Sequence, residues 1–180
     1  MKTLRICYLS TGGGFLTVIS EMAEREYSIE WKVYNSKDYG VPQNRERVYI
    51  VGYIGERCTR DLLPIARENS LSIQQIGNLT NTNSFGGNHQ SGRVYSTNGI
   101  APTINTCGGG NLEPKIMIGR RVRKITPREF WRLQGFTDEQ FDKAAAVNSN
   151  SQLYKQAGNA VTVNVVEEIG KHIMSVENGA

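Results

Sequence analysis

A polar and charged pentad, residues 43–47 (QNRER), directly precedes the apolar run of residues 48–54 (VYIVGYI). A continuous apolar run of this length, which includes β-branched and aromatic residues, is typical of a strand buried on both faces. Because side chains alternate along a strand, Arg45 and Arg47 are predicted on one face and Glu46 on the other. Two guanidinium groups on one face could clamp an anion or the edge of a base. The alternative is a solvated strand start with a local ion pair.

The net charge offers little guidance about a partner, but the distribution of charge does. The chain has 180 residues, enough for one full domain or two small ones, and a formal net charge of +4. Basic residues crowd into one short stretch, at a density suited to contacts with phosphate groups: Arg120, Arg121, Arg123, Lys124, Arg128 and Arg132. A solvated, basic helix face is the alternative interpretation of this stretch.

Several classes of protein are disfavoured by the sequence. No stretch reaches the roughly 20 continuous apolar residues of a membrane span, and the first residues lack the apolar length of a secretory signal, so we expect a cytoplasmic protein without a membrane partner. Cys7, Cys58 and Cys107 are widely spaced and include no Cys-x-x-Cys pair, which argues against a disulfide framework and a zinc cluster. With only His89 and His172 as histidines, we expect neither a metal site nor a Ser-His or Cys-His catalytic pair.

Apolar spacing predicts regular structure at both ends of the chain. Helices are expected over residues 15–26 and 165–176, and a strand over residues 29–33. The stripe of apolar residues in the second helix is typical of a helix that packs on a core. A helix, two strands and a returning helix make only part of a sheet domain.

The middle of the chain has a different character. Residues 77–111 are rich in Gly and Asn, yet they contain two short runs typical of strands, at residues 93–97 and 100–104. We therefore expect an ordered, loop-rich small domain rather than a disordered linker. The sequence Thr126-Pro127-Arg128-Glu129 is a capping box with proline at the first helical position, so a helix is predicted to start there and to end near Gly135.

Three blocks of the chain together resemble the last three signature motifs of DNA cytosine-5 methyltransferases. The blocks are residues 39–48 (YGVPQNRERV), 125–136 (ITPREFWRLQGF) and 154–161 (YKQAGNAV). Their order and rough spacing also match, and the resemblance covers nearly the whole chain from about residue 10. This resemblance identifies the chain as a member of the family, corresponding to its C-terminal portion.

The resemblance implies an α/β fold. It consists of a partial S-adenosylmethionine-dependent methyltransferase (Rossmann-like) domain plus a small, loop-rich, mostly β target recognition domain. Residues 1–55 would be the remnant of the catalytic domain, with a helix and two strands, and residues 56–145 the target recognition domain. Residues 146–180 would hold the C-terminal helix that returns to the catalytic domain.

In this family the target cytosine is flipped out of the duplex, at an unstacking cost of roughly a few kcal/mol. The resemblance implies that Arg45 and Arg47 orient the flipped base, with Arg47 at the cytosine carbonyl oxygen. Arg93 would read a guanine edge, where a bidentate contact is worth about 1–3 kcal/mol. The full set of residues implied at the DNA is Gln90, Arg93, Thr103 and Gly110.

The resemblance is incomplete at the methyl donor. Gly158, Asn159 and Ala160 would contact the methionine end of S-adenosylmethionine, the expected cofactor. The family's glycine loop, its Pro-Cys nucleophile and its Glu-Asn-Val motif do not occur in these 180 residues. Without the cysteine thiolate, carbon 5 of cytosine is not activated. We therefore expect the isolated chain to be inactive.

Two kinds of partner follow from the resemblance. Double-stranded DNA is the expected substrate, and a complementing methyltransferase subunit, or self-association, is expected to cover the sheet edge and apolar faces left open. A shortened gene product or an incomplete polypeptide would have the same open surfaces. The alternative function is that of a non-catalytic, DNA-binding remnant of a truncated methyltransferase.

Overall fold

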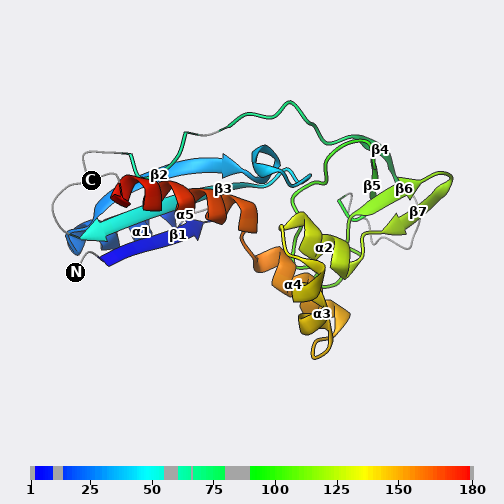
Figure 1. The fold of residues 1–180 in the computed structure, drawn as a ribbon. Coiled ribbons are helices and arrows are strands. Elements are labelled where there is room, and N and C mark those ends of the chain that lie inside the picture. The colour runs from blue at the N-terminus through cyan, green and yellow to red at the C-terminus, as the bar shows by residue number, and fades with distance from the viewer. Residues whose placement is uncertain (1–2, 10–13, 55–60, 66, 80–89, 179–180) are drawn as a thin grey trace.

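The computed structural model describes residues 3–9, 14–54, 61–65, 67–79 and 90–178, and of residues 3–9 it describes the backbone alone. The described chain forms two sheets at opposite ends of an elongated molecule, with a group of short helices near the second sheet (Figure 1). None of the described helices is long and apolar enough to cross a membrane. The mixed α/β architecture expected from the sequence is therefore observed.

The first sheet has three strands in the order β1-β3-β2: β1 (Thr3–Leu9), β2 (Ser28–Asn35) and β3 (Glu46–Ile54). Both pairings are antiparallel. The central strand is β3, and its residues 49–53 are buried, as predicted for a strand covered on both faces. Only two strands are predicted in residues 1–55, so β1 is an addition. The alternating Leu4, Ile6 and Tyr8 carry its signal in the sequence.

The closing helix predicted over residues 165–176 is observed as α5 (Val163–Asn178). Val165, Ile169 and Ile173 are buried and follow one another at intervals of one helical turn. They pack with a core from the first sheet and the segments around it: Tyr34, Tyr39, Tyr49, Val51, Tyr53, Leu62 and Leu63. The apolar stripe of the helix is therefore part of the core, as predicted.

The opposite face of the first sheet carries α1 (Phe15–Glu24), which ends two residues before the helix predicted over residues 15–26. The helix approaches β3 closely, because a Cβ at Gly52 would lie 2.1 Å from Met22 Cε. Even so, α1 contains no buried residue, and Leu16 is 76% exposed. The described residues therefore cover the apolar face of α1 only in part.

The second sheet has four short strands in the order β4-β5-β6-β7: β4 (Gln75–Asn78), β5 (Arg93–Ser96), β6 (Lys115–Ile118) and β7 (Arg121–Lys124). The strand predicted over residues 93–97 is confirmed as β5. The strand predicted over residues 100–104 is wrong, because Ala101 alone forms a bridge, with Gln43, and Pro102 has no N–H to continue a ladder. The other three strands are not predicted, because their sequences, QIGN, KIMI and RVRK, lack the run of β-branched and aromatic residues that marks β5.

Three helices lie near this sheet: α2 (Pro127–Leu133), α3 (Asp138–Ala145) and α4 (Asn150–Asn159). The predicted capping box starts α2, and Gly135, with a φ of 83°, follows its end as predicted. A second capping box, formed by Thr137 and Gln140, starts α3. Neither α3 nor the start of α4 is predicted, although the spacing of Thr137 and Gln140 is the same signal that reveals α2.

Helix α4 packs with α2 and α3. Buried Ala157 of α4 shares a core with Phe130 of α2 and with Ile104 and Ile125. Among the described residues after 146, α5 is the helix that packs on the first sheet. The segment predicted to return to the first sheet covers residues 146–180, and within it the contacts with that sheet start near the beginning of α5.

Local ion pairs engage most of the basic stretch predicted to contact phosphate groups. The pairs are Arg123–Glu129 at 2.6 Å, Lys124–Glu113 at 3.1 Å, Arg128–Asp142 at 2.5 Å and Arg132–Asp138 at 2.7 Å. In the contacts of the described chain, Arg120 and Arg121 are the two members of the stretch without a carboxylate partner. The stretch is therefore not a continuous track for phosphate groups.

We expect acid to weaken the start of α2. The hydrogen bond from Arg123, assisted by the Thr126 amide and hydroxyl, lowers the pKa of the Glu129 carboxyl to about 2. Stability from a lowered carboxyl pKa is complete above the ordinary value near 4 and is lost as the pH falls toward 2. Between pH 6 and pH 2 the wild-type chain should lose about 1–2 kcal/mol more than Glu129→Gln, allowing for solvent screening.

Urea unfolding at a series of pH values measures this difference. Glu139→Gln is the control, because Glu139 is an exposed carboxylate that pairs with Lys143 one turn away. Identical pH dependence for the wild-type and Glu129→Gln chains would contradict the assignment.

Candidate functional site

Arg45 occupies the junction between the two ends of the molecule. It lies just before β3, is 2% exposed, and donates to the carbonyl oxygens of Ile104 at 3.1 Å and of Gly158 and Ala160 at 2.9 Å each. The last carbonyls of a helix have no donor within the helix, and Arg45 supplies donors at the end of α4. The prediction that Arg45 and Arg47 form a clamp on one open face is therefore wrong for Arg45, whose guanidinium is buried against the backbone.

The pentad is also fixed to the segment that follows β5. The Ala101 amide donates to Pro42 O at 2.8 Å, and the Asn44 amide donates to Ala101 O at 2.9 Å. The Thr103 hydroxyl donates to Asn44 O at 2.6 Å. Segments 42–45 and 101–104 thus run side by side, and the structure brings Thr103, predicted near the DNA backbone, next to the pentad.

A buried polar network links the same junction to α2. Ser36 Oγ and Thr162 Oγ1 lie 2.6 Å apart, and the Thr162 hydroxyl donates to Gln134 Oε1 at 2.9 Å. Gln134 is 0% exposed and donates to the Ala157 carbonyl at 2.7 Å. None of these three side chains is among the site residues predicted from the sequence. Only Gln134 could have been found there, because it lies in the second motif block. The network joins the second and third motif blocks through Gln134 and Ala157, and Ser36 Oγ, which also donates to Arg45 O at 3.3 Å, connects it to the first block.

Arg47 differs from Arg45 in its surroundings. It lies in β3 opposite Tyr34, is partly buried, and donates through Nη1 to the Glu46 carbonyl at 2.6 Å. Glu46 itself is exposed. Arg47 is therefore the arginine of the pentad that remains at the surface, at the end of the strand closest to the junction.

The remaining candidates for DNA contact lie in loops of the second sheet. Gln90 is exposed in the turn before β5, and its carbonyl accepts from the amide of Arg93 at 3.4 Å. Arg93 begins β5 and is partly buried. Gly110 is exposed with a φ of 67°, a conformation that favours glycine.

A family model of C-5 cytosine-specific DNA methylases matches residues 8–82 and 59–175. The chain belongs to this family. The family expected from the three motif blocks is therefore confirmed.

Individual methylases that resemble the chain are longer than it is. It is 32% identical over 199 residues to the Type II methyltransferase M.HhaI of Haemophilus parahaemolyticus, covering 92% of this chain and 59% of that protein. It is 28% identical over 282 residues to the orphan methyltransferase M.SPBetaI of Bacillus phage SPbeta, covering 92% of this chain and 63% of that protein. The chain thus spans about three fifths of the length of these relatives.

Solved methyltransferase structures share the fold. The S. pombe Dnmt2 methyltransferase matches with a TM-score of 0.66 and 14% identity, over 97% of this chain and 66% of that one. The Entamoeba histolytica methyltransferase EhMeth matches with a TM-score of 0.63 and 14% identity, over 89% of this chain and 57% of that one. The arrangement of the two sheets and the helices is therefore a methyltransferase fold.

The residues expected at the methyl donor in such a methylase lie at the end of a helix. Gly158 and Asn159 are the last residues of α4, and Ala160 caps it. A Cβ at Gly158 would lie 2.4 Å from the backbone oxygen of Asn105, so glycine is required for the helix to approach that segment. Gly158 therefore has a packing role that the sequence analysis does not foresee.

Of these three residues, Ala160 is the one that lines a described cavity, which is a candidate site for S-adenosylmethionine. Ala160 lines a cavity of about 560 Å³ together with apolar side chains and one carboxylate: Phe136, Val161, Val163, Val166 and Glu167. The carbonyl oxygens of Gly158 and Ala160 already accept from Arg45. The residues that line this cavity do not by themselves supply enough polar groups to hold the whole of S-adenosylmethionine.

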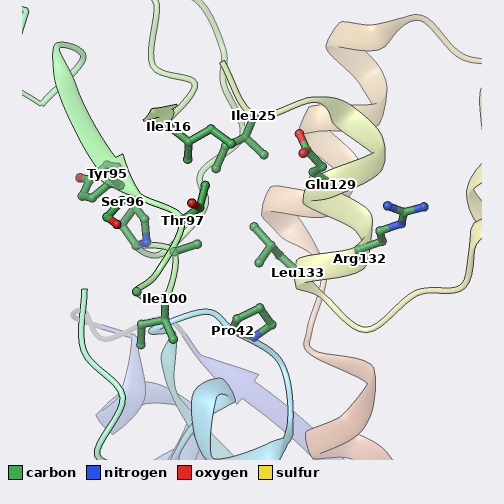
Figure 2. A pocket seen from close by; sticks show the side chains of 13 residues that line it. Pro42, Tyr95, Ser96, Thr97, Ile100, Ile116, Ile125, Glu129, Arg132 and Leu133 are labelled. Atoms are coloured by element: carbon green, nitrogen blue, oxygen red, sulfur yellow. The ribbon is translucent and has the colours of Figure 1, made fainter. Parts of the chain in front are cut away.

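A second cavity, of about 340 Å³, lies between β5, the segment after it and α2 (Figure 2). Leu133 points into it, whereas Arg132 points away from it (Figure 2). Ile100, Ile116 and Ile125 supply further apolar lining. The cavity is therefore a mainly apolar space between the second sheet and α2, and Arg132 is the one cation among its lining residues.

Cys107 does not replace the missing nucleophile. It is buried, and burial raises the pKa of its thiol to about 12, whereas an attacking cysteine needs a thiolate near neutral pH. Cys58, His89 and the side chain of Cys7 lie outside the described residues. Among the residues that the structure describes, no three His, Cys, Asp or Glu side chains form a group that could hold a metal ion.

Proposed function

We propose that this chain is the part of a DNA (cytosine-5) methyltransferase that recognises a DNA sequence and holds the flipped target cytosine. The donor site and the attacking thiolate are completed by other polypeptide, and the isolated chain is inactive. The observation that carries the proposal is the junction at Arg45, where the pentad contacts both the segment after β5 and the end of α4. A preorganised junction of this kind suits the positioning of a base.

The roles of the two arginines differ in this proposal. Arg47, partly exposed at the end of β3, donates to the carbonyl oxygen of the flipped cytosine. Arg45 is a positioning residue, because its guanidinium is engaged with Ile104, Gly158 and Ala160. Thr103 lies beside the pentad and faces the backbone of the flipped nucleotide. Contacts of this kind offset the cost of unstacking the base, roughly a few kcal/mol.

S-adenosylmethionine, when bound, supplies the methyl group. Ala160 contributes to the lining of the cavity described above, with Asn159 next to it at the end of α4, and Gly158 lets that helix end lie against residues 105 and 106. The cytoplasm, where thiols such as that of Cys107 stay reduced, is the compartment we propose.

The complementing polypeptide covers the apolar face of α1. That helix contains no buried residue, and its Leu16 is 76% exposed. The face lies on the first sheet, which is the part of the fold that corresponds to the catalytic domain. A second copy of this chain could cover the same face but would not supply the Pro-Cys motif.

Complementation tests the proposal. The chain is mixed, or produced together, with a polypeptide of the same family that carries the glycine loop, the Pro-Cys motif and the Glu-Asn-Val motif. Transfer of labelled methyl groups to duplex DNA is then measured for the mixture and for each polypeptide alone. We expect transfer by the mixture alone. Methyl transfer by the 180-residue chain alone contradicts the proposal. The absence of methyl transfer from a folded mixture that binds DNA also contradicts it and favours a non-catalytic DNA-binding remnant.

Arg93 should determine one position of the recognised sequence. A bidentate contact from Arg93 to a guanine edge predicts that Arg93→Ala weakens binding to the preferred duplex by about 1–3 kcal/mol, or roughly 5- to 150-fold. Binding to unrelated duplexes should change little. Selection from a randomised duplex library should show relaxed choice at one base pair.

Arg121→Ala is the matched control, because Arg121 is an exposed arginine on β7 outside the predicted reading loops. It removes the same charge and should leave the selected sequence unchanged. An equal loss of affinity on all sequences after Arg93→Ala would refute the role of Arg93 in reading a base.

A further inference from the structure

Lys115 is a buried cation outside the junction. It begins β6, where it lies opposite Val94 of β5 and Lys124 of β7, and it is 4% exposed. Its Nζ donates to the carbonyl oxygens of Ser91 at 2.5 Å, Asn111 at 2.9 Å and Glu113 at 3.1 Å. Lysine is rarely buried to this extent unless its charge is satisfied.

The carbonyl oxygens that Lys115 joins belong to two separate loops. Ser91 lies in the turn between Gln90 and Arg93. Asn111 directly follows the three glycines 108–110 and has a φ of 57°. Lys115 therefore connects the loops that carry three of the residues expected at the DNA, although it is itself covered.

A second lysine strengthens the connection from the neighbouring strand. Lys124 Nζ donates to the side-chain oxygen of Asn111 at 3.1 Å and pairs with Glu113 at 3.1 Å. Burial, and then the charge of Lys124, lower the pKa of Lys115, while the nearby Glu113 opposes this shift. Lys115 thus pays the free-energy cost of removing a charge from water, a cost that an apolar residue at the same position would not have.

The buried ammonium group of Lys115 makes three hydrogen bonds that an apolar side chain could not make. Three donors on one atom fix the distances from that atom to three backbone oxygens, and thereby the distance between the two loops. Glycines 109 and 110, with φ of 121° and 67°, let the chain adopt its conformation but do not hold it there. A fixed separation matters for bases, because bidentate contacts tolerate little displacement.

We propose that Lys115 is a positioning residue that sets the separation of the Gln90–Arg93 turn and the glycine 108–110 loop, and thereby determines sequence choice without touching DNA. This inference rests on the proposed function, since it assigns the two loops to DNA recognition. A lysine that only stabilised the small sheet would change the folded fraction and leave the sequence choice of the folded molecules unaltered.

The test compares Lys115→Gln and Lys115→Met with the wild-type chain. Glutamine retains an amide that can donate to part of the set of oxygens, whereas methionine retains the length without any donor. Lys143→Met is the matched control, because Lys143 is an exposed lysine on α3, 76% exposed in its side chain, and loses the same charge. Near-ultraviolet circular dichroism gives the folded fraction, and affinities are expressed per folded molecule.

Two measurements are made on each variant. The first is the ratio of affinities for the duplex selected by the wild-type chain and for a scrambled duplex. We expect Lys115→Gln to lower this ratio by about 10-fold and Lys115→Met by more, with affinity for the scrambled duplex unchanged. The second is amide hydrogen exchange, which should accelerate at residues 90–93 and 108–113 while the first sheet keeps its protection.

The outcomes separate this inference from the proposed function. An unchanged ratio in folded Lys115→Gln, or unchanged exchange in both loops, overturns the role of Lys115. If the wild-type chain shows no preference among duplexes, the assignment of the loops to DNA and the inference built on it both fall. A wild-type chain that discriminates, together with a lowered ratio and faster exchange in the variant, supports both. If Lys115→Met does not fold, Lys115→Gln decides the question.

Discussion

Replacing Arg47 with alanine should reduce methyl transfer by the complemented methylase by about 100- to 1,000-fold, because one preorganised donor at a reacting group is worth this much. The affinity for duplex DNA should change by less than about threefold, since most of that affinity comes from phosphate contacts made elsewhere. Single-turnover transfer of labelled methyl groups, measured beside an equilibrium binding titration, gives the two numbers.

The position of Arg47 accounts for this separation of rate from affinity. It is the second residue of β3, next to Glu46, and is partly exposed. Its guanidinium donates to the Glu46 carbonyl. Arg121→Ala is a suitable control, since it removes the same charge from the exposed strand β7. Should Arg47→Ala retain transfer within about tenfold of the wild-type rate, the assignment of Arg47 to the base would be wrong.

Replacing Arg45 with methionine should lower the free energy of unfolding by about 3–5 kcal/mol, a large part of the stability of a typical domain. The substitution removes the Arg45 donors from the carbonyl oxygens of Ile104, Gly158 and Ala160, of which Ala160 O keeps a longer bond from Gln134 Nε2 at 3.3 Å. Each buried acceptor left unsatisfied costs about 1–3 kcal/mol, with some relief where water enters. Urea unfolding followed by circular dichroism measures the change.

Two further variants make the second prediction specific. Arg45→Lys should restore only part of the stability, because one ammonium group cannot reproduce the planar guanidinium fork that reaches both Ile104 and the end of α4. Arg47→Met should cost less than about 1 kcal/mol, because its side chain is partly exposed. A cost below about 1 kcal/mol for Arg45→Met would show that the buried hydrogen bonds do not hold the junction together.

The sequence predicts best those features that depend on neighbours along the chain. The apolar run of β3, the stripe of α5 and the capping box of α2 each carry a local signal, and all three are present. The strands β4, β6 and β7 carry no such signal, because four-residue strands depend on pairing with residues far away in the sequence.

The candidate site shows the same limit. Spacing along the strand predicts one face for Arg45 and Arg47, but the burial of Arg45 depends on carbonyl oxygens contributed by residues 104, 158 and 160. The polar network of Ser36, Gln134 and Thr162 likewise joins residues more than a hundred positions apart. The motif blocks contain Arg45 and Gln134, while the contacts that these two residues make come from the fold.

The parallel contact between residues 42–45 and 101–104 bears on how new sequence preferences could arise in this methylase. Hydrogen bonds from both backbones make this seam intolerant of insertions or deletions, because a shift of one residue would break several of them at once. Exchange of recognition segments between relatives should therefore succeed when the crossover points spare the seam, and fail when they cut through it.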